Sequence, residues 1–305
     1  MYNIKDFKIK SDFDGLNLGV TLISPKEKAK GIVQISHGMS EHRRRYIGFM
    51  KFLAKHGYVT IINDHRGHGE SVLSPQDLGY FYKNGHIGIV KDIHQIRNYV
   101  KGLYPNLPIT LLGHSMGSIV AREYIKQYGD IDKLILCGVP TENNSAKLGL
   151  KLCDAIRLFH GQKYRCELVN NLVLGAYNKN FKVENSWICS DENVVDAYNK
   201  DENCGFTFTL NGFKCLFTML IDVYSKENWN KENLNMPILM IAGKDDPVIM
   251  TEHAFYKTKD FLKEIGYSNV ESKLYDNMRH ELINEKGKDI VYQDILNYLE
   301  KDVNH

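Results

Sequence analysis

Ser115 stands in a short motif, Gly113-His114-Ser115-Met116-Gly117, whose residue types could carry nucleophilic catalysis. An apolar run over residues 108–112 precedes the motif, and a stretch with helical character follows it. A serine in a tight strand-to-helix turn adopts a strained backbone conformation that only small neighbours allow. The turn exposes the hydroxyl beside the free N–H groups of the helix N-terminus. The pattern predicts a nucleophile, because a plain turn would leave the two flanking glycines unexplained.

A serine hydroxyl needs a base, and the base needs an orienting carboxylate. On a strand-to-helix turn of this kind, the acid and then the histidine follow the serine along the chain. Asp245 and Asp246 come directly after the apolar run 237–243. We favour Asp246, although an aspartate before a proline is also typical of a helix N-cap, so the pair alone decides little. Of twelve histidines, His280 is the one in the loop after the last predicted strand, and it is the candidate base.

Two backbone N–H groups are expected to stabilise the negative oxygen that forms when the serine attacks a carbonyl. Each such donor contributes on the order of a hundredfold or more in rate. One donor belongs to the residue after the nucleophile, which is Met116. We assign the other to Met39, which follows the apolar run ending at His37-Gly38. The chemistry requires no metal and no organic cofactor.

Short apolar runs alternate with helical stripes over most of the chain. This alternation predicts an α/β protein with a mostly parallel central sheet flanked by helices on both faces. An Asp-Gly pair at residues 14–15 separates two strand-like runs near the N-terminus and favours a hairpin. The predicted strands cover 7–24 as that hairpin, then 31–38, 58–63, 108–112, 133–139, 237–243 and 271–275, and helices are expected over 46–56, 87–103, 116–128 and 289–299.

The alternation of predicted strands and helices stops after residue 139 and resumes near residue 237. Between them the sequence contains helical stripes, one of which includes Leu148 and Phe159, but no clear buried strand. We therefore expect a core formed by residues 1–139 and 234–305, and a helical cap inserted at 140–233. Active sites of such sheets lie at the carboxyl ends of the strands, so the cap should cover the serine.

Composition excludes several classes of protein. The formal net charge is +2, which does not favour nucleic acid as a partner. Residues 1–10 mix charged and apolar side chains, so we expect neither a signal peptide nor a membrane span, and we predict a cytoplasmic protein. The six cysteines show no Cys-x-x-Cys spacing, so they are expected to be thiols rather than zinc ligands or a redox pair.

Several motifs together resemble one family. The segment His37-Gly38-Met39-Ser40-Glu41-His42, with Arg45-Tyr46, resembles a signature of monoacylglycerol lipases and related lysophospholipases. Met39 departs from the small residue common there, which leaves the backbone N–H but could narrow the pocket. Further segments similar to that family are 64–71, 113–117, 243–248, 279–281 and, in the insertion, 186–188 and 204–209. The resemblance covers nearly the whole chain and implies an α/β-hydrolase with a helical cap and a catalytic triad of Ser115, Asp246 and His280.

The resemblance implies a lipid ester as substrate, a medium- or long-chain monoacylglycerol or lysophospholipid. Most aromatic residues of the insertion are expected to pack the cap, but a surplus could line an acyl groove. The residues expected there are Phe206, Phe208, Phe213 and Phe217. We also expect that a cap of this kind can make transient contact with a membrane surface.

Three other functions stay open at this point. The first is a broad carboxylesterase, or an aryl or cinnamoyl esterase, with the same triad. The second is an aminopeptidase of the same superfamily, which would need cap carboxylates such as Glu167, Glu184, Asp191 or Glu192 to hold the substrate amine. The third, a ligand-binding module with a decayed triad, is disfavoured because all three triad candidates are present.

Overall fold

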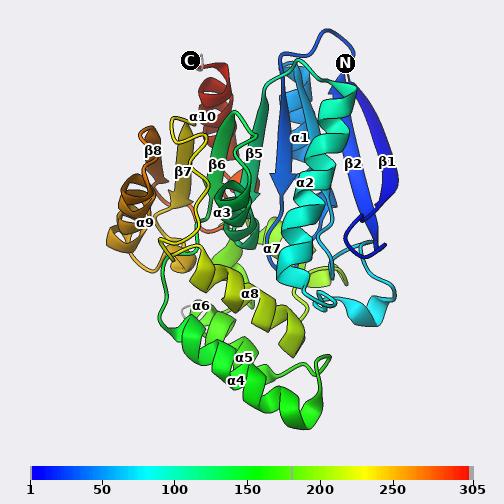
Figure 1. Cartoon of the computed structure of the whole chain (residues 1–305). Coiled ribbons are helices and arrows are strands. Elements are labelled where there is room, and N and C mark those ends of the chain that lie inside the picture. The colour runs from blue at the N-terminus through cyan, green and yellow to red at the C-terminus, as the bar shows by residue number, and fades with distance from the viewer. Residues whose placement is uncertain (1, 180, 302–305) are drawn as a thin grey trace.

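The structure, a computed structural model, describes residues 2–179 and 181–301 and is built around one eight-stranded sheet (Figure 1). The strand order across the sheet is β1-β2-β4-β3-β5-β6-β7-β8. The strands are β1 (Tyr2–Lys10), β2 (Asn17–Pro25), β3 (Gly31–Ser36), β4 (Tyr58–Asn63), β5 (Ile109–His114), β6 (Lys133–Cys137), β7 (Ile238–Gly243) and β8 (Val270–Tyr275). This is the α/β-hydrolase fold that the sequence predicts.

The sheet is parallel except at one edge. β1 and β2 form the predicted antiparallel hairpin, and β2 also pairs antiparallel with β4. From β4 through β3, β5, β6 and β7 to β8 every neighbour is parallel. The central strands β3 to β7 are buried along their whole length, which explains why each reads as a continuous apolar run.

Helices cover both faces of the sheet. On one face α1 and α10 pack over one set of strand side chains, such as Leu112. On the other face α2, α3 and α9 pack over the alternate set, such as Leu111. Successive residues of a strand point to opposite faces, so one strand serves both cores. These helices are α1 (Ile47–Lys55), α2 (Gly85–Leu103), α3 (Met116–Gln127), α9 (Glu252–Ile265) and α10 (Lys288–Glu300).

The segment between β6 and β7 is helical and lies at the carboxyl ends of the strands (Figure 1). Its helices are α4 (Ser145–His160), α5 (Glu167–Asn170), α6 (Ala176–Asn178), α7 (Glu192–Lys200) and α8 (Leu210–Asp222), with a π-helical turn over Asn171–Gly175. α8 packs on α4 and also on α2 and α3, so its apolar residues continue the core cluster of the sheet. In the part of the chain that the structure describes, no helix is both long and apolar enough to cross a bilayer.

Candidate active site

Ser115 forms the turn between β5 and α3 with a left-handed φ of 53° and a ψ of −120°. Glycines on either side permit the close approach that this turn needs. A Cβ atom on Gly113 would lie 2.3 Å from the Gly117 carbonyl oxygen, and one on Gly117 would lie 2.0 Å from the Ser36 oxygen. The Ser115 N–H donates to the Cys137 carbonyl at 2.9 Å, which ties the turn to β6. The strained backbone conformation of Ser115 is therefore maintained by close packing at the glycines on both sides.

His280 and Asp246 meet at the same edge of the sheet. Nδ1 of His280 lies 2.9 Å from Oδ2 of Asp246, and both side chains are buried. The second carboxylate oxygen of Asp246 accepts the Val248 N–H at 2.8 Å, so the residue also caps the short helical turn that follows. Asp245, the alternative acid, is exposed. The structure thus brings Asp246, and not its neighbour, to the histidine.

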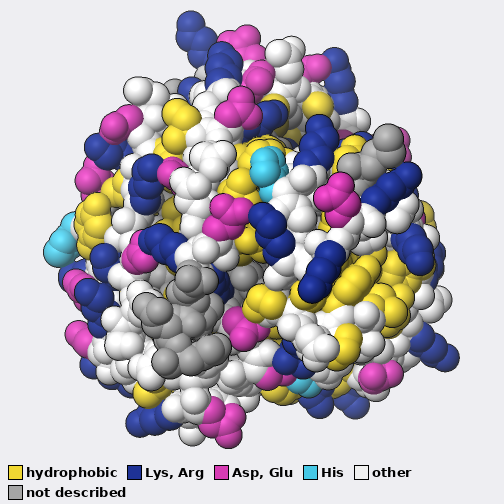
Figure 2. Space-filling view, turned by 90° about the horizontal axis from the view of Figure 1, so that it is seen from above, with side chains coloured by type: hydrophobic (Ala, Val, Ile, Leu, Met, Phe, Trp, Pro, Cys, Tyr) yellow, Lys and Arg dark blue, Asp and Glu magenta, His cyan; other side chains and the backbone are white. Residues whose placement is uncertain are grey.

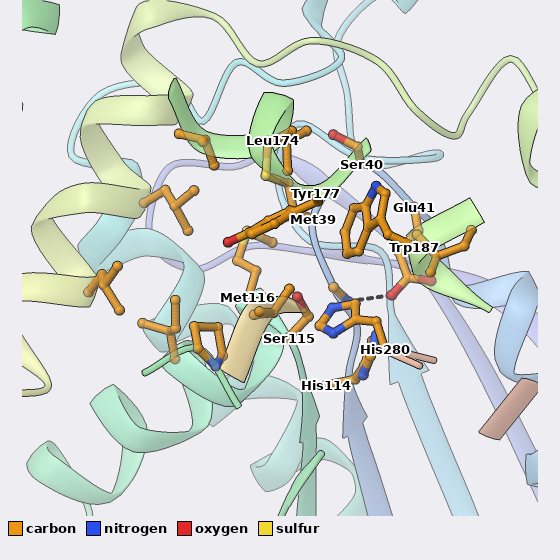
Figure 3. Close-up of a pocket in the computed structure, with 18 of the residues that line it drawn as sticks. Met39, Ser40, Glu41, His114, Ser115, Met116, Leu174, Tyr177, Trp187 and His280 are labelled. Carbon is orange, nitrogen blue, oxygen red and sulfur yellow. Dashed lines mark hydrogen bonds between the residues drawn. The ribbon is translucent and has the colours of Figure 1, made fainter. Parts of the chain in front are cut away.

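Burial and the Asp246 carboxylate act in opposite directions on His280. Burial alone disfavours the imidazolium and lowers the pKa, but attraction to Asp246 and the hydrogen bond to it outweigh burial and raise the pKa of His280 above 6.5. Figure 3 shows the Ser115 side chain next to this imidazole, and both line one cavity. These two described side chains form no hydrogen bond with each other here. Such contacts commonly tighten only when substrate arrives.

Met39 and Met116 both line the cavity beside Ser115 (Figure 3). Met39 lies in the loop after β3, and Met116 is the first residue of α3. Among the described residues, no protein acceptor takes a hydrogen bond from the backbone N–H of either methionine. Two free amides beside the serine are what an oxyanion hole requires.

A buried ionic network, which sequence reasoning did not assign a role, supports the Met39 loop. Glu41 Oε1 accepts the Gly38 N–H at 2.6 Å and the Tyr46 hydroxyl at 2.7 Å. Arg45 joins Glu41, at 2.7 Å, to Glu281, at 2.5 Å. Burial by itself would raise the pKa of Glu41, but Arg45 and its other partners lower it to about 2. The network therefore links the loop before α1 to the residue after His280.

The cavity has one apolar wall and one polar wall. The apolar wall comes from α3, the π-helical turn and α8, and consists of Ile119, Leu172, Val173, Leu174, Leu216, Phe217 and Leu220. The polar wall includes Ser40, Glu41, Asn185, Tyr198 and Glu281. Trp187 and Tyr177 lie between these walls and above Ser115 (Figure 3). A substrate with one apolar and one polar end fits this division.

Only one of the four phenylalanines expected to line an acyl groove is part of the cavity wall. Phe217 lines the cavity, whereas Phe206, Phe208 and Phe213 do not. Phe208 and Phe213 are fully buried, and Phe208 packs on Phe81 with ring centroids 5.1 Å apart. Phe213 lies on α8 and Phe208 lies just before it, and both pack in the core, so the acyl wall is formed mainly by aliphatic residues instead.

One group of described side chains has the spacing of metal ligands. His42, Asp201 and Cys204 offer ligand atoms that all lie within 4.8 Å of one another. Nε2 of His42 is hydrogen-bonded to Asp201 Oδ2 at 2.8 Å, which accounts for that arrangement without an ion. The proposed ester chemistry uses none of the three residues.

Comparison with known proteins assigns the chain to a family. The model of one family, serine aminopeptidase, S33, matches residues 27–287. The chain belongs to this hydrolase family. It is 26% identical to a monoglyceride lipase of Rattus norvegicus over 281 residues, which cover 89% of this chain and 82% of the relative. It is 24% identical to a monoacylglycerol lipase of Mycolicibacterium smegmatis over 93% of both chains. A thermostable carboxyl esterase from Bacillus coagulans, solved with glycerol, superposes with a TM-score of 0.89 at 26% identity, over 98% of this chain and 99% of that one.

Proposed function

We propose that this S33 family member hydrolyses carboxylic esters through an acyl-enzyme on Ser115. The observation that carries the proposal is the contact between buried Asp246 and His280 beside a serine held at a strained turn. The names of the curated relatives and of the structural neighbour, which are lipases and an esterase, support the same reaction.

Each residue has one role in the proposed reaction. His280 takes the proton of the Ser115 hydroxyl as its oxygen attacks the ester carbonyl, and Asp246 holds the imidazole and stabilises its charge. The Met39 and Met116 N–H groups receive the negative oxygen of the tetrahedral intermediate. His280 then protonates the departing alcohol. Water, activated by the same histidine, attacks the acyl-enzyme, and the carboxylic acid and free serine are released.

The two walls of the cavity favour a monoacylglycerol or a lysophospholipid as substrate. An acyl chain would lie along the aliphatic wall, and the polar alcohol would face the polar wall. Aryl and cinnamoyl esters are the second candidate class, because Trp187 and Tyr177 also border the cavity. A panel of glycerol esters of increasing chain length, lysophospholipids and aryl esters, each run beside Ser115→Ala, tests the assignment. Activity confined to acetyl or aryl esters would contradict it.

An aminopeptidase reaction is less well supported, despite the family's name. A free amine needs an unpaired carboxylate near the nucleophile. None of the four cap candidates, Glu167, Glu184, Asp191 and Glu192, lines the cavity. The carboxylates that do, Glu41 and Glu281, are both paired with Arg45. We therefore expect amino-acyl amides to be poor substrates in the same panel.

The cap carries apolar side chains that could contact a lipid surface. Leu158 is 79% exposed, Phe159 86% and Leu168 64%. By contrast, Figure 2 shows that basic and acidic side chains are interspersed across the end of the molecule farthest from the cap. We infer transient membrane contact through α4 and α5. Co-sedimentation with phosphatidylcholine vesicles should fall for the double variant Leu158→Ser, Phe159→Ser, and equal binding by both proteins would contradict the inference. A cytoplasmic location stays a prediction from the sequence.

A further inference from the structure

The indole of Trp187 is a cavity group that the proposed chemistry leaves unused. Its ring centroid lies 5.2 Å from that of His280 and 5.0 Å from that of Tyr177. The side chain is buried, and its Nε1–H has no hydrogen-bond partner within the described part of the chain. Leaving a buried donor unpaired costs free energy, so nearly all such groups in native proteins have an acceptor. An unpaired donor in the wall of a substrate cavity therefore points to an acceptor on the substrate.

Two neighbouring polar groups on this side of the cavity already have partners. The Ser40 hydroxyl donates to the Phe206 carbonyl at 2.7 Å, and the Tyr198 hydroxyl donates to the Ser40 carbonyl at 3.0 Å. Among the described lining residues, Nδ1 of His114 is also unpaired, but Figure 3 shows His114 on the sheet side of His280, away from the cap. Among the described side chains that line the cavity, Trp187 thus carries the buried donor without a partner on the cap side of the histidine.

The segment that carries Trp187 is fixed to the loop that carries His280. The Ile188 carbonyl accepts the Glu281 N–H at 2.7 Å. The Arg279 guanidinium donates to the carbonyls of Ser186, at 2.6 Å, and of Cys189, at 2.9 Å. These bonds hold the indole and the imidazole as one unit. Since His280 must deliver a proton to the departing alcohol, the indole stands on the alcohol side of the site.

We propose that the Trp187 Nε1–H donates a hydrogen bond to a hydroxyl oxygen of the leaving alcohol, which makes Trp187 a specificity residue for esters of polyhydroxy alcohols such as glycerol. The inference rests on the proposed ester hydrolysis and assigns the alcohol end of that site. Figure 3 shows the indole nitrogen at the edge of the ring away from Ser115, so it would meet a substituent of the alcohol rather than the scissile carbonyl. The nitrogen is covered in this structure, so a shift of the neighbouring cap wall must accompany binding.

Trp187→Phe keeps an aromatic ring against His280 and removes the N–H. The test compares kcat/KM for 1-monolauroylglycerol and ethyl laurate, which share the acyl chain and differ in the alcohol. We expect the variant to lose about five- to tenfold on the glyceryl ester, the size of one neutral hydrogen bond, and to stay within about twofold on the ethyl ester. Trp229→Phe is the matched control, because the Trp229 N–H donates to Ser225 at 2.7 Å, outside the cavity wall. It should leave the ratio of the two substrates unchanged.

Equal losses on both esters would overturn the inference, because the ring would then act only by supporting His280. An unchanged ratio with full activity would overturn it as well. Failure of the underlying function is distinguishable, since the wild-type protein would then cleave neither ester. As a second measurement, Ser115→Ala should bind the non-hydrolysable ether 1-O-dodecylglycerol about five- to tenfold more tightly than the double variant Ser115→Ala, Trp187→Phe does. Equal affinity of the two proteins would contradict the proposal even if Trp187→Phe were poorly active.

Discussion

Nδ1 of His280 and Oδ2 of Asp246 lie 2.9 Å apart, although 34 positions separate them in the chain. The contact joins the loop after β7 to the loop after β8, two parallel neighbours whose carboxyl ends share one edge of the sheet. A carboxylate at Nδ1 favours the tautomer that leaves Nε2 free to accept a proton. In the proposed mechanism this relationship both orients the base and sets its pKa.

Asp246→Asn tests both effects, the orientation of the base through kcat and its pKa through the pH profile. We expect kcat to fall by about 10⁴, the loss seen when the acid of such a triad becomes an amide. The base acts when it is neutral, so wild-type kcat/KM should rise with pH through a pKa above 6.5. Removing the carboxylate that raises the pKa of His280 should move this rise to lower pH. Exposed Asp245→Asn is the control and should keep both rate and profile; an unshifted rise in Asp246→Asn would contradict the assignment.

Arg45 and Arg44 are adjacent but differ in burial, so they form a matched pair for stability. Arg45 is 11% exposed and holds two buried carboxylates, Glu41 and Glu281. Arg45→Met leaves both without a counter-charge and should lower the free energy of unfolding by about 3–5 kcal/mol. Arg44 is 57% exposed and pairs with exposed Glu70, so Arg44→Met should cost about 1 kcal/mol or less. Urea denaturation of both variants measures the difference, and equal losses would show that the network is not the cause.

Glu123 should make stability depend on pH. It lies on α3, where burial, followed by the nearby Asp222 carboxylate, raises the pKa of Glu123 to about 8. Between the ordinary pKa of about 4.5 and 8, the folded state then binds more protons than the unfolded state, so stability falls as pH rises. Glu123→Gln removes this contribution and should raise Tm at pH 9 by at least about 2–4 °C relative to wild type, with little gain at pH 4.5. An equal change of Tm at both pH values would contradict the prediction.

Leu220 tests the apolar wall of the cavity. Leu220→Trp adds volume where the acyl chain is proposed to lie, so the longest glycerol ester that is hydrolysed should become several carbons shorter. Acetyl and butyryl esters should keep kcat/KM within about threefold. Leu103→Trp is the control, because Leu103 is exposed at the end of α2. A uniform loss at every chain length would instead indicate a general packing defect.

The presence of the sheet and the succession of strands and helices along the chain could be predicted, because buried parallel strands appear in the sequence as continuous apolar runs. β5 begins and ends within two residues of its predicted bounds, and the turn at Ser115 follows from the glycines beside it. The choice between Asp245 and Asp246 was harder, since chain order allows either. The loop after β7 buries Asp246 and exposes Asp245, a difference of one position that sequence pattern alone does not resolve.

The cap was less predictable because a helical stripe does not reveal what covers it. Leu148 and Phe159 belong to one stripe, yet both are exposed. Phe208 and Phe213, which were expected to line the acyl groove, face the core instead of the cavity. The unpaired Trp187 nitrogen depends on the positions of several segments at once, so no local pattern could indicate it.

Labelling with a long-chain alkyl fluorophosphonate tests the central proposal most directly. Intact-protein mass spectrometry should show one adduct on the wild-type protein, and peptide mapping should place it on Ser115. Ser115→Ala should fold normally, take up no label and lose on the order of 10⁶ in kcat. An adduct on another residue, or ester hydrolysis that survives in Ser115→Ala, would contradict the account.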